Sequence, residues 1–239
     1  MQKNVEKMSI NYSPNFDRKK RSNSKVKYLI FHYTGMKSEN AAIKRLTNES
    51  TKVSCHYFIK NNGEIIKIVP DLYIAWHAGI SSWKKDKSIN SNSIGIEIYN
   101  PGHNHGYKNF NQKQVSSIIY LLKKLKKKYK IKKENILGHS DIAPLRKKDP
   151  GEKFPWKLLN KKKLSLWHSL SEKSCKKLRS IKLKDSENFF QLLFKFGYKS
   201  TKNLNERIKI YKNFQRRFRP QLISSIVDRE SYAILKSLI

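Results

Sequence analysis

The sequence predicts an α/β fold over roughly its first two thirds, followed by a small helical domain. Short apolar segments with the spacing of buried strands recur between residues 26 and 137, and a long amphipathic helix lies among them. After residue 186 the apolar residues show helical spacing only. A chain of 239 residues, 38% of them hydrophobic, is long enough to fill the cores of both parts.

The first predicted strand covers residues 26–34. Its apolar residues occupy both sides of the strand, which is the pattern of a strand that is buried on both faces. His32 comes near its end, after an unbroken apolar run. We therefore expect the His32 imidazole to lie at one edge of a buried sheet.

A helix at 39–48 and two further strands are predicted next. The strands cover 54–60 and 64–69, and the turn sequence Asn61-Asn62-Gly63 between them is typical of a β-hairpin.

A strand at 93–99 has two unlike faces. Ile94, Ile96 and Ile98 form an apolar face, whereas Glu97 lies on the opposite face between Gly95 and Tyr99. A carboxylate on such a strand must face either solvent or a polar cleft. Glu97 is therefore a candidate general base, with a surface charge as the alternative.

The clearest predicted helix covers 112–129. Asn111 has the chemistry of an N-cap, and Gln114 stands three residues later, as in a capping box. Apolar residues recur at helical spacing along it, and its lysines form the outer face.

Three helical patterns follow at 187–196, 204–218 and 229–238. Asn203 and Asp228 are suitable N-caps for the second and third, and Pro220 follows the second. A Lys-rich connector with a short helix separates them from the first part of the chain. The predicted organisation is a larger α/β domain at 8–160, a connector at 161–186 and a helical domain at 187–239.

The composition limits the class of protein. The formal net charge is +34, but only 10 of the 52 basic residues are Arg, the residue that phosphate recognition favours. A bias toward Lys explains this charge at least as well as an anionic partner does. Cys55 and Cys175 are far apart and outside any CxxC spacing, so we expect two free thiols.

The chain is expected to lack a transmembrane segment, because no apolar run approaches about 20 residues. The first 25 residues also lack the apolar core of a secretory signal. A cytoplasmic protein is the corresponding expectation, with the periplasm or cell envelope as the alternative.

Two histidines and an aspartate are candidate metal ligands. His32 ends a strand, His139 follows a short apolar stretch, and Asp149 precedes Pro150-Gly151. Two imidazoles and one carboxylate would leave a coordination position of zinc open for water, as hydrolysis requires. Lys147, two residues before Asp149, is a candidate for stabilising an oxyanion. Hydrogen-bonded structural histidines are the alternative interpretation.

Six linked motifs resemble the zinc-dependent type-2 N-acetylmuramoyl-L-alanine amidases, which are relatives of the peptidoglycan recognition proteins. They occur in family order at residues 31–34 (FHYT), 54–59 (SCHYFI), 75–79 (AWHAG), 93–98 (SIGIEI), 138–144 (GHSDIAP) and 149–151 (DPG). The segment 100–107 (NPGHNHGY) is similar to the AmiD-like branch, which carries an appended peptidoglycan-binding domain. Residues 214–220 (FQRRFRP) resemble that domain, although an unrelated helical packing module would show the same apolar pattern.

The resemblance implies a central mixed sheet flanked by helices, and one zinc ion held by His32, His139 and Asp149. It also implies that Glu97 is the base and that Lys147 is the oxyanion partner. The positions matching a substrate groove are Trp76, His77 and Asn90, although a core role for Trp76 and a structural one for His77 remain alternatives. The sequence departs from the family pattern at Leu145 and Glu152, which flank the Lys147 and Asp149 segment.

The implied activity is hydrolysis of the amide bond between the lactyl group of N-acetylmuramic or anhydro-N-acetylmuramic acid and L-alanine. Peptidoglycan or its muropeptide fragments would be the substrate, in wall turnover or recycling, and the enzyme would act as a monomer. The alternatives are a peptidoglycan receptor without catalysis and a phage-type endolysin. A specific nucleic-acid-binding protein is a remote alternative, because only the positive net charge favours it.

Overall fold

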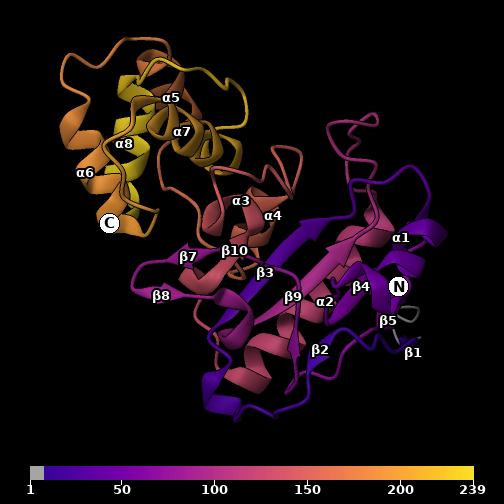
Figure 1. Cartoon of the computed structure of the whole chain (residues 1–239). Coiled ribbons are helices and arrows are strands. Elements are labelled where there is room, and N and C mark those ends of the chain that lie inside the picture. Colours follow the sequence, from indigo (N-terminus) through magenta and orange to yellow (C-terminus); the bar gives the residue numbers. More distant parts are fainter. Residues whose placement is uncertain (1–7) are drawn as a thin grey trace.

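The computed structural model describes residues 8–239, and a mixed six-stranded sheet forms the centre of this part of the chain (Figure 1). Only β4 and β5 pair antiparallel, and the other neighbours in the sheet are parallel. In spatial order the strands are β1 (Met8–Ile10), β5 (Ile65–Lys67), β4 (Tyr57–Ile59), β9 (Ser93–Ile98), β3 (Tyr28–Tyr33) and β10 (Ile136–Gly138). This confirms the predicted α/β class and mixed sheet.

Short elements connect the strands. Two small antiparallel ribbons join β2 (Phe16–Asp17) to β6 (Ile74–Ala75) and β7 (Ser82–Trp83) to β8 (Asp86–Lys87). Single turns of 3₁₀ helix are η1 (Asn23–Lys25), η2 (Glu49–Thr51), η3 (Ile89–Asn92) and η4 (Lys133–Asn135). None of these elements was predicted, because two to four residues are too short for an apolar period to be visible.

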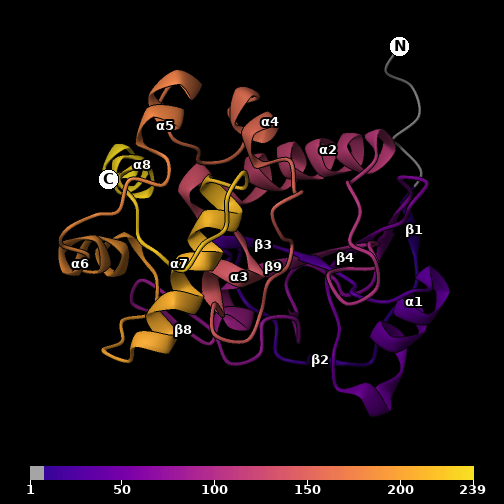
Figure 2. The ribbon, with the colours of Figure 1, turned by 90° about the horizontal axis from the view of Figure 1, so that it is seen from above.

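Helix α2 (Gln112–Tyr129) covers one face of the sheet, together with α4 (Trp156–Lys161) (Figure 2). The predicted capping box is present: Asn111 Oδ1 accepts from the Gln114 amide, and Gln114 Oε1 accepts from the Asn111 amide. The buried apolar face of α2, which includes Ile118, shares one hydrophobic cluster with Leu29 and Phe31 of β3. The amphipathic pattern of this helix thus identifies the face that packs on the sheet.

The opposite face of the sheet is covered by two groups of elements. Helix α1 (Glu39–Thr47), as predicted, packs over β4 and β5 in a cluster that contains Leu46 and Phe58. The short helix α3 (His139–Ile142) and the C-terminal helices pack against Tyr28 and Ile30 of β3. The two groups belong to separate hydrophobic clusters, and the pocket described below lies between them.

The C-terminal helices are α5 (Glu172–Leu178), α6 (Glu187–Phe196), α7 (Leu204–Phe218) and α8 (Arg229–Leu238) (Figure 1). The bounds of α6, α7 and α8 confirm the predicted ones. Asn203 and Asp228 accept from the backbone of the first turns of α7 and α8, as expected of N-caps. The division into domains at 8–160, 161–186 and 187–239 stays a prediction. No helix among residues 8–239 is both long and apolar enough to cross a bilayer.

Candidate active site

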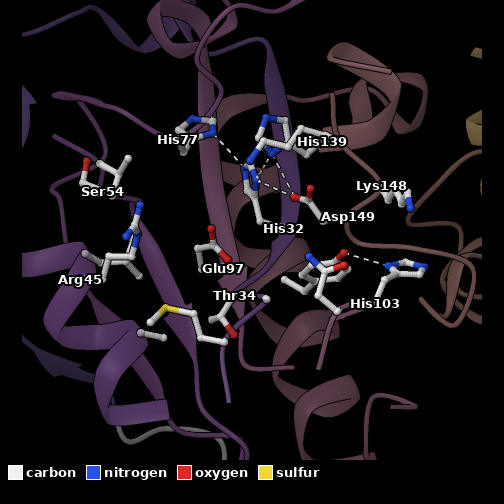
Figure 3. Close-up of a pocket in the computed structure, with 18 of the residues that line it drawn as sticks. His32, Thr34, Arg45, Ser54, His77, Glu97, His103, His139, Lys148 and Asp149 are labelled. Carbon is white, nitrogen blue, oxygen red and sulfur yellow. Dashed lines mark hydrogen bonds and ion pairs between the residues drawn. The ribbon is translucent and has the colours of Figure 1, made fainter. Parts of the chain in front are cut away.

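Three candidate ligands meet at the end of the sheet. The Nδ1 atoms of His32 and His139 are 2.9 Å apart, and Asp149 Oδ2 lies 3.2 Å from the first and 3.0 Å from the second (Figure 3). All three side chains are buried. Within residues 8–239 this is the group of His, Cys, Asp and Glu side chains arranged to hold a metal ion.

Sheet register brings the two histidines together. Strand β10 pairs in parallel with β3, so that Gly138 lies beside Phe31. The next residues along the two strands, His139 and His32, are therefore neighbours at the same edge of the sheet. Asp149 joins them because its carbonyl oxygen accepts a hydrogen bond of 2.8 Å from the Ser140 amide.

A chain of hydrogen bonds fixes the tautomer of His32. The Ser93 hydroxyl donates to Ile89 O at 2.6 Å, so it can only accept from His77 Nε2 at 3.1 Å. His77 Nδ1 is then the acceptor for His32 Nε2 at 3.0 Å. Burial, followed by the nearby His32 and His56, holds the pKa of His77 well below 6.5 and keeps it neutral. His32 therefore carries its proton on Nε2, and its Nδ1 lone pair faces the cluster.

His139 is oriented in the same way by a different partner. Its Nε2 lies 3.1 Å from Ala78 O, which can only accept, so Nε2 carries the proton. In the neutral imidazole the Nδ1 lone pair then faces His32 Nδ1 and the Asp149 carboxylate. Histidine ligands of metals are held by outer partners of this kind.

The donor set fits a divalent cation. Three acceptor atoms face one another with no protein donor between them. A bound cation would relieve the repulsion between their lone pairs. Tetrahedral zinc, with bonds of about 2.0–2.1 Å, would separate its ligand atoms by about 3.3 Å, close to the distances found here. Burial lowers the pKa of His32 to about 4, helped by His139. Burial alone would raise the pKa of Asp149, but the two imidazoles outweigh it and keep this pKa below its usual range.

Glu97 lies beside this cluster. Its partner across the β3–β9 pairing is His32, so both side chains leave the sheet on the same face. The Glu97 carboxylate points into the pocket in Figure 3, and its Oε2 is buried without a hydrogen-bond partner among the described residues. Burial, followed by the Asp149 charge, raises the pKa of Glu97 to about 8, against the opposing effect of Lys147.

The pocket that contains these residues has a volume of about 430 Å³. Lys147 is part of its wall, as are Trp76 and His77. The sequence reasoning missed another cation of the wall, Arg45 of α1, which lies on the side opposite Lys148 (Figure 3).

The three predicted groove residues differ in whether they line the pocket. Trp76 lines the pocket, and its indole Nε1 donates to Asp17 Oδ1 at 2.8 Å. His77 lines it too, but its ring nitrogens are both used by His32 and Ser93. Asn90 is not part of the wall: its Oδ1 accepts from the amides of His77 and Ala78, and so holds the loop that carries them.

Ser93 and His103 were missed as site residues. The signal for Ser93 was available, since it precedes Gly95 and Glu97 on the polar face of the same strand. A Cβ at Gly95 would overlap the His77 ring, so this face of β9 is shaped around the site.

His103 lies on the pocket wall and outside the metal-ligand cluster, with Nδ1 2.9 Å from Tyr33 Oη. His56 is a buried neighbour of the site, and its Nδ1 accepts the Gly95 amide at 3.0 Å.

Known amidases resemble this chain in sequence. A family described as N-acetylmuramoyl-L-alanine amidase matches residues 22–152. The amidase AmiD of Escherichia coli K12 is 32% identical over 231 residues, which cover 90% of this chain and 83% of AmiD. The 1,6-anhydro-N-acetylmuramyl-L-alanine amidase AmpD of Haemophilus influenzae is 41% identical over 44% of this chain and 55% of AmpD.

Solved structures resemble the chain over nearly its full length. The complex of E. coli AmiD with anhydro-N-acetylmuramic acid-L-Ala-D-γ-Glu-L-Lys has a TM-score of 0.80 and 31% identity, and it covers 93% of this chain and 91% of AmiD. AmpDh3 of Pseudomonas aeruginosa in complex with an anhydromuramic pentapeptide has a TM-score of 0.80 and 27% identity, covering 94% of this chain and 95% of that one. The fold, the matched region and the long AmiD alignment together place the chain in the N-acetylmuramoyl-L-alanine amidase family.

Proposed function

We propose that this protein hydrolyses the amide bond between the lactyl group of N-acetylmuramic or anhydro-N-acetylmuramic acid and L-alanine. The observation that carries the proposal is the convergence of His32, His139 and Asp149 beside Glu97 in one pocket. Membership of the amidase family makes an amide the bond to be cleaved.

The residues that would hold a zinc ion are His32 through Nδ1, His139 through Nδ1 and Asp149 through its carboxylate. When bound, zinc supplies Lewis acidity toward an amide carbonyl, and its positive charge favours the ionised form of Glu97. The hydrogen bonds from His32 to His77 and from His139 to Ala78 O orient the two imidazoles before any ion arrives.

Glu97 has the role of the general base. A carboxylate whose pKa lies near neutrality can take a proton from water and return it to the departing amine of L-alanine. Its buried Oε2 has no competing hydrogen-bond donor among the described residues, so it is free for this transfer.

Lys147 has the role of the oxyanion partner. Lys147 belongs to the pocket wall two residues before Asp149. Its ammonium group would stabilise negative charge on the carbonyl oxygen as the carbon becomes tetrahedral. The product is a free stem peptide with a protonated amino terminus.

The pocket also suits an acidic peptide. Arg45, Lys147 and Lys148 line it, whereas its carboxylates are Glu97 and Asp149, both assigned to the reaction. The relative AmiD was crystallised with an anhydromuramyl tripeptide that contains a γ-linked Glu. We propose muropeptides of this kind as substrates, cleaved by a monomer, since every residue of the site comes from one chain.

The test is hydrolysis by the protein of anhydro-N-acetylmuramic acid-L-Ala-D-γ-Glu-L-Lys and of its N-acetylmuramic counterpart, with release of the tripeptide followed by liquid chromatography and mass spectrometry. We expect cleavage at the lactyl amide, loss of cleavage after treatment with a chelator, and recovery when zinc is added. Binding of either compound without cleavage in the presence of zinc would contradict the proposal and indicate a receptor. Light scattering measures the molar mass in solution and so tests whether the protein is a monomer.

A further inference from the structure

The segment that carries Lys147 and Asp149 is a tight turn with contacts on two sides. The amides of Arg146 and Lys147 both donate to Ala143 O, at 3.2 and 3.1 Å. One side of the turn faces the pocket, where Lys147 is part of the wall. The other side meets helix α7, which comes more than 50 residues later in the chain.

Asn213 of α7 holds this turn at both ends. Its Nδ2 donates to Pro144 O at 2.7 Å and to Lys147 O at 3.0 Å, so both amide hydrogens are used. Its Oδ1 accepts from Arg216 Nη1 at 2.9 Å. Because a guanidinium can only donate, this contact fixes which end of the Asn213 amide faces the turn. The side chain is 2% exposed, so water does not replace these bonds at low cost.

Helix α7 also holds the segment that precedes the turn. Arg217 Nη2 donates to Ile136 O at 2.9 Å, and its Nη1 forms a buried ion pair with Asp141. Asp141 further accepts from Tyr198 Oη at 2.6 Å and from the Gly138 amide at 2.7 Å. The backbone on both sides of His139 is therefore anchored by the C-terminal helices.

The two positions at which the sequence departs from the family pattern make contacts to the same helices. Leu145 packs against the hydrophobic cluster that the C-terminal helices share with β3 and β10. Glu152 lies 3.6 Å from Arg216 Nε and 3.1 Å from His103 Nε2. The turn in this chain is thus adapted to α7 by its own side chains as well as by Asn213.

We infer that Asn213 is a positioning residue for the amidase reaction: it holds the Pro144–Lys147 backbone so that the Lys147 ammonium faces the pocket. The inference rests on the proposed role of Lys147. Asp149 keeps its own hydrogen bond from the Ser140 amide, so metal binding does not depend on Asn213. A displacement of about 1 Å at a reacting group can cost about 10²-fold in rate, which makes the effect measurable.

The experiment compares the zinc-loaded wild type with Asn213→Leu, which keeps the volume of the side chain and removes both donors. We expect kcat for the anhydromuramyl tripeptide to fall at least about tenfold, with KM and zinc content nearly unchanged. Hydrogen exchange of the peptide that covers residues 143–149 should become faster.

Two further variants separate positioning from a general loss of stability. Ile234→Ala removes buried volume from α8 and leaves every hydrogen bond of α7 to the turn in place. At a temperature well below both melting points it should keep its kcat. In a Lys147→Ala background, Asn213→Leu should lower kcat little further, because coupled residues are not additive.

The inference is overturned if Asn213→Leu keeps wild-type kcat, if its effect multiplies fully with that of Lys147→Ala, or if Ile234→Ala loses as much activity. Unchanged exchange in residues 143–149 would also overturn it. A wild-type protein that binds zinc without cleaving muropeptides would refute the amidase proposal instead, and the exchange comparison would still decide whether Asn213 holds the turn.

Discussion

His32 can serve as a metal ligand only while its proton stays on Nε2. That condition is set along a hydrogen-bond chain that runs through His77 and Ser93 to the carbonyl of Ile89. His77 therefore contributes to the site through its neighbour, which agrees with the structural interpretation of this residue more than with a groove role. The motif at 75–79 shows a histidine without showing which atom it will contact.

Replacement of Ser93 by Ala should weaken zinc binding. The variant removes the acceptor for His77 Nε2, so His77 can turn or change tautomer and leave His32 Nε2 without its partner. Loss of such an outer partner typically costs about 10–100-fold in metal affinity. Competition with a chromophoric chelator measures the affinity. Ser91→Ala is the matched control, because Ser91 Oγ donates only to Ser88 O. An equal loss of zinc affinity in both variants would contradict the role of the hydrogen-bond chain through His77 and Ser93.

Replacement of Glu97 by Gln should abolish most of the turnover and leave zinc bound. Gln keeps the size of the side chain but cannot take a proton, and general base catalysis is typically worth about 10²–10⁴-fold. Initial rates with zinc-loaded protein, together with metal analysis, test this. Glu49→Gln, at an exposed site in η2, should behave like the wild type. Near-normal turnover in Glu97→Gln would remove Glu97 from the mechanism.

Strand β9 shows how one element serves both the core and the site. Ile94, Ile96 and Ile98 are fully buried and pack in the cluster beneath α2. On the other face Ser93 holds His77, and Glu97 enters the pocket. A shift of one residue in this strand would exchange the two faces, so its register is essential to the reaction as well as to the fold.

A second buried network, which contains none of the three candidate metal ligands, joins α2 to β4 around Asp71. Tyr57 and Tyr129 donate to its carboxylate at 2.5 and 2.7 Å, and Lys128 does so at 2.8 Å. Burial alone would raise the pKa of Asp71, but these donors hold it well below the ordinary value of 3.8. Because the folded-state pKa is depressed, the carboxylate stabilises the fold above about pH 4, and this contribution is lost as the pH falls further.

Asp71→Asn should therefore destabilise the protein at pH 7 by about 1.5–3 kcal/mol, the range for hydrogen bonds to a charged group. The difference from the wild type should shrink as the pH is lowered below about 4, because the unfolded wild-type chain then binds a proton that the folded carboxylate, with its depressed pKa, still excludes. Urea unfolding of both proteins at several pH values measures it. A difference that stays constant down to about pH 2 would show that the Asp71 charge contributes nothing.

The longer helices and the main strands could be predicted from the sequence, whereas the two-residue ribbons and the 3₁₀ turns could not. Helices α2, α7 and α8 begin at side chains that cap them, namely Asn111, Asn203 and Asp228. The 3₁₀ turns η1, η3 and η4 lack such a cap, and η2, which Asn48 does cap, is only three residues long. In the site, the motifs indicated His32, His139 and Asp149, and the structure brings these together. Asn213 could not be found, since one Asn in an amphipathic helix carries no sign of a partner some 66 positions earlier.

At the scale of the molecule, the C-terminal helices and the sheet share one hydrophobic cluster. Phe214 and Phe218 of α7 belong to the same group as Tyr28 and Ile30 of β3 and Leu137 of β10. Arg217 adds a buried ion pair across this contact. Neither part could be separated from the other without exposing apolar surface, at about 25 cal/mol per Å².

Thermal unfolding should accordingly be one cooperative transition. Calorimetry of the zinc-loaded protein should give a single endotherm whose calorimetric and van't Hoff enthalpies agree. The same melting point should appear in near-ultraviolet circular dichroism, where aromatic residues of both parts contribute. Two separated transitions would mean that the helical segment folds independently and that the shared cluster contributes little to cooperativity.

The Arg residues clarify the charge of the whole chain. At least seven of the ten form hydrogen bonds to protein groups, as the contacts of Arg21, Arg146, Arg179, Arg207, Arg216, Arg217 and Arg219 show. Because 42 of the 52 basic residues are Lys, most of the surplus charge is carried by Lys. This favours a compositional bias toward Lys over a surface built for phosphate recognition.

Because α7 holds the Pro144–Lys147 turn through Asn213, the C-terminal helices of this protein cannot be exchanged freely for another domain. A chimera that joins residues 1–160 to the targeting module of another protein would keep every ligand and the base, yet lose the amide that bridges the turn. Such a fusion would also expose the apolar surface that the sheet shares with the C-terminal helices, so it should be less stable than the intact protein as well as slower. An active chimera would have to keep α7 together with the Pro144–Lys147 turn that it supports.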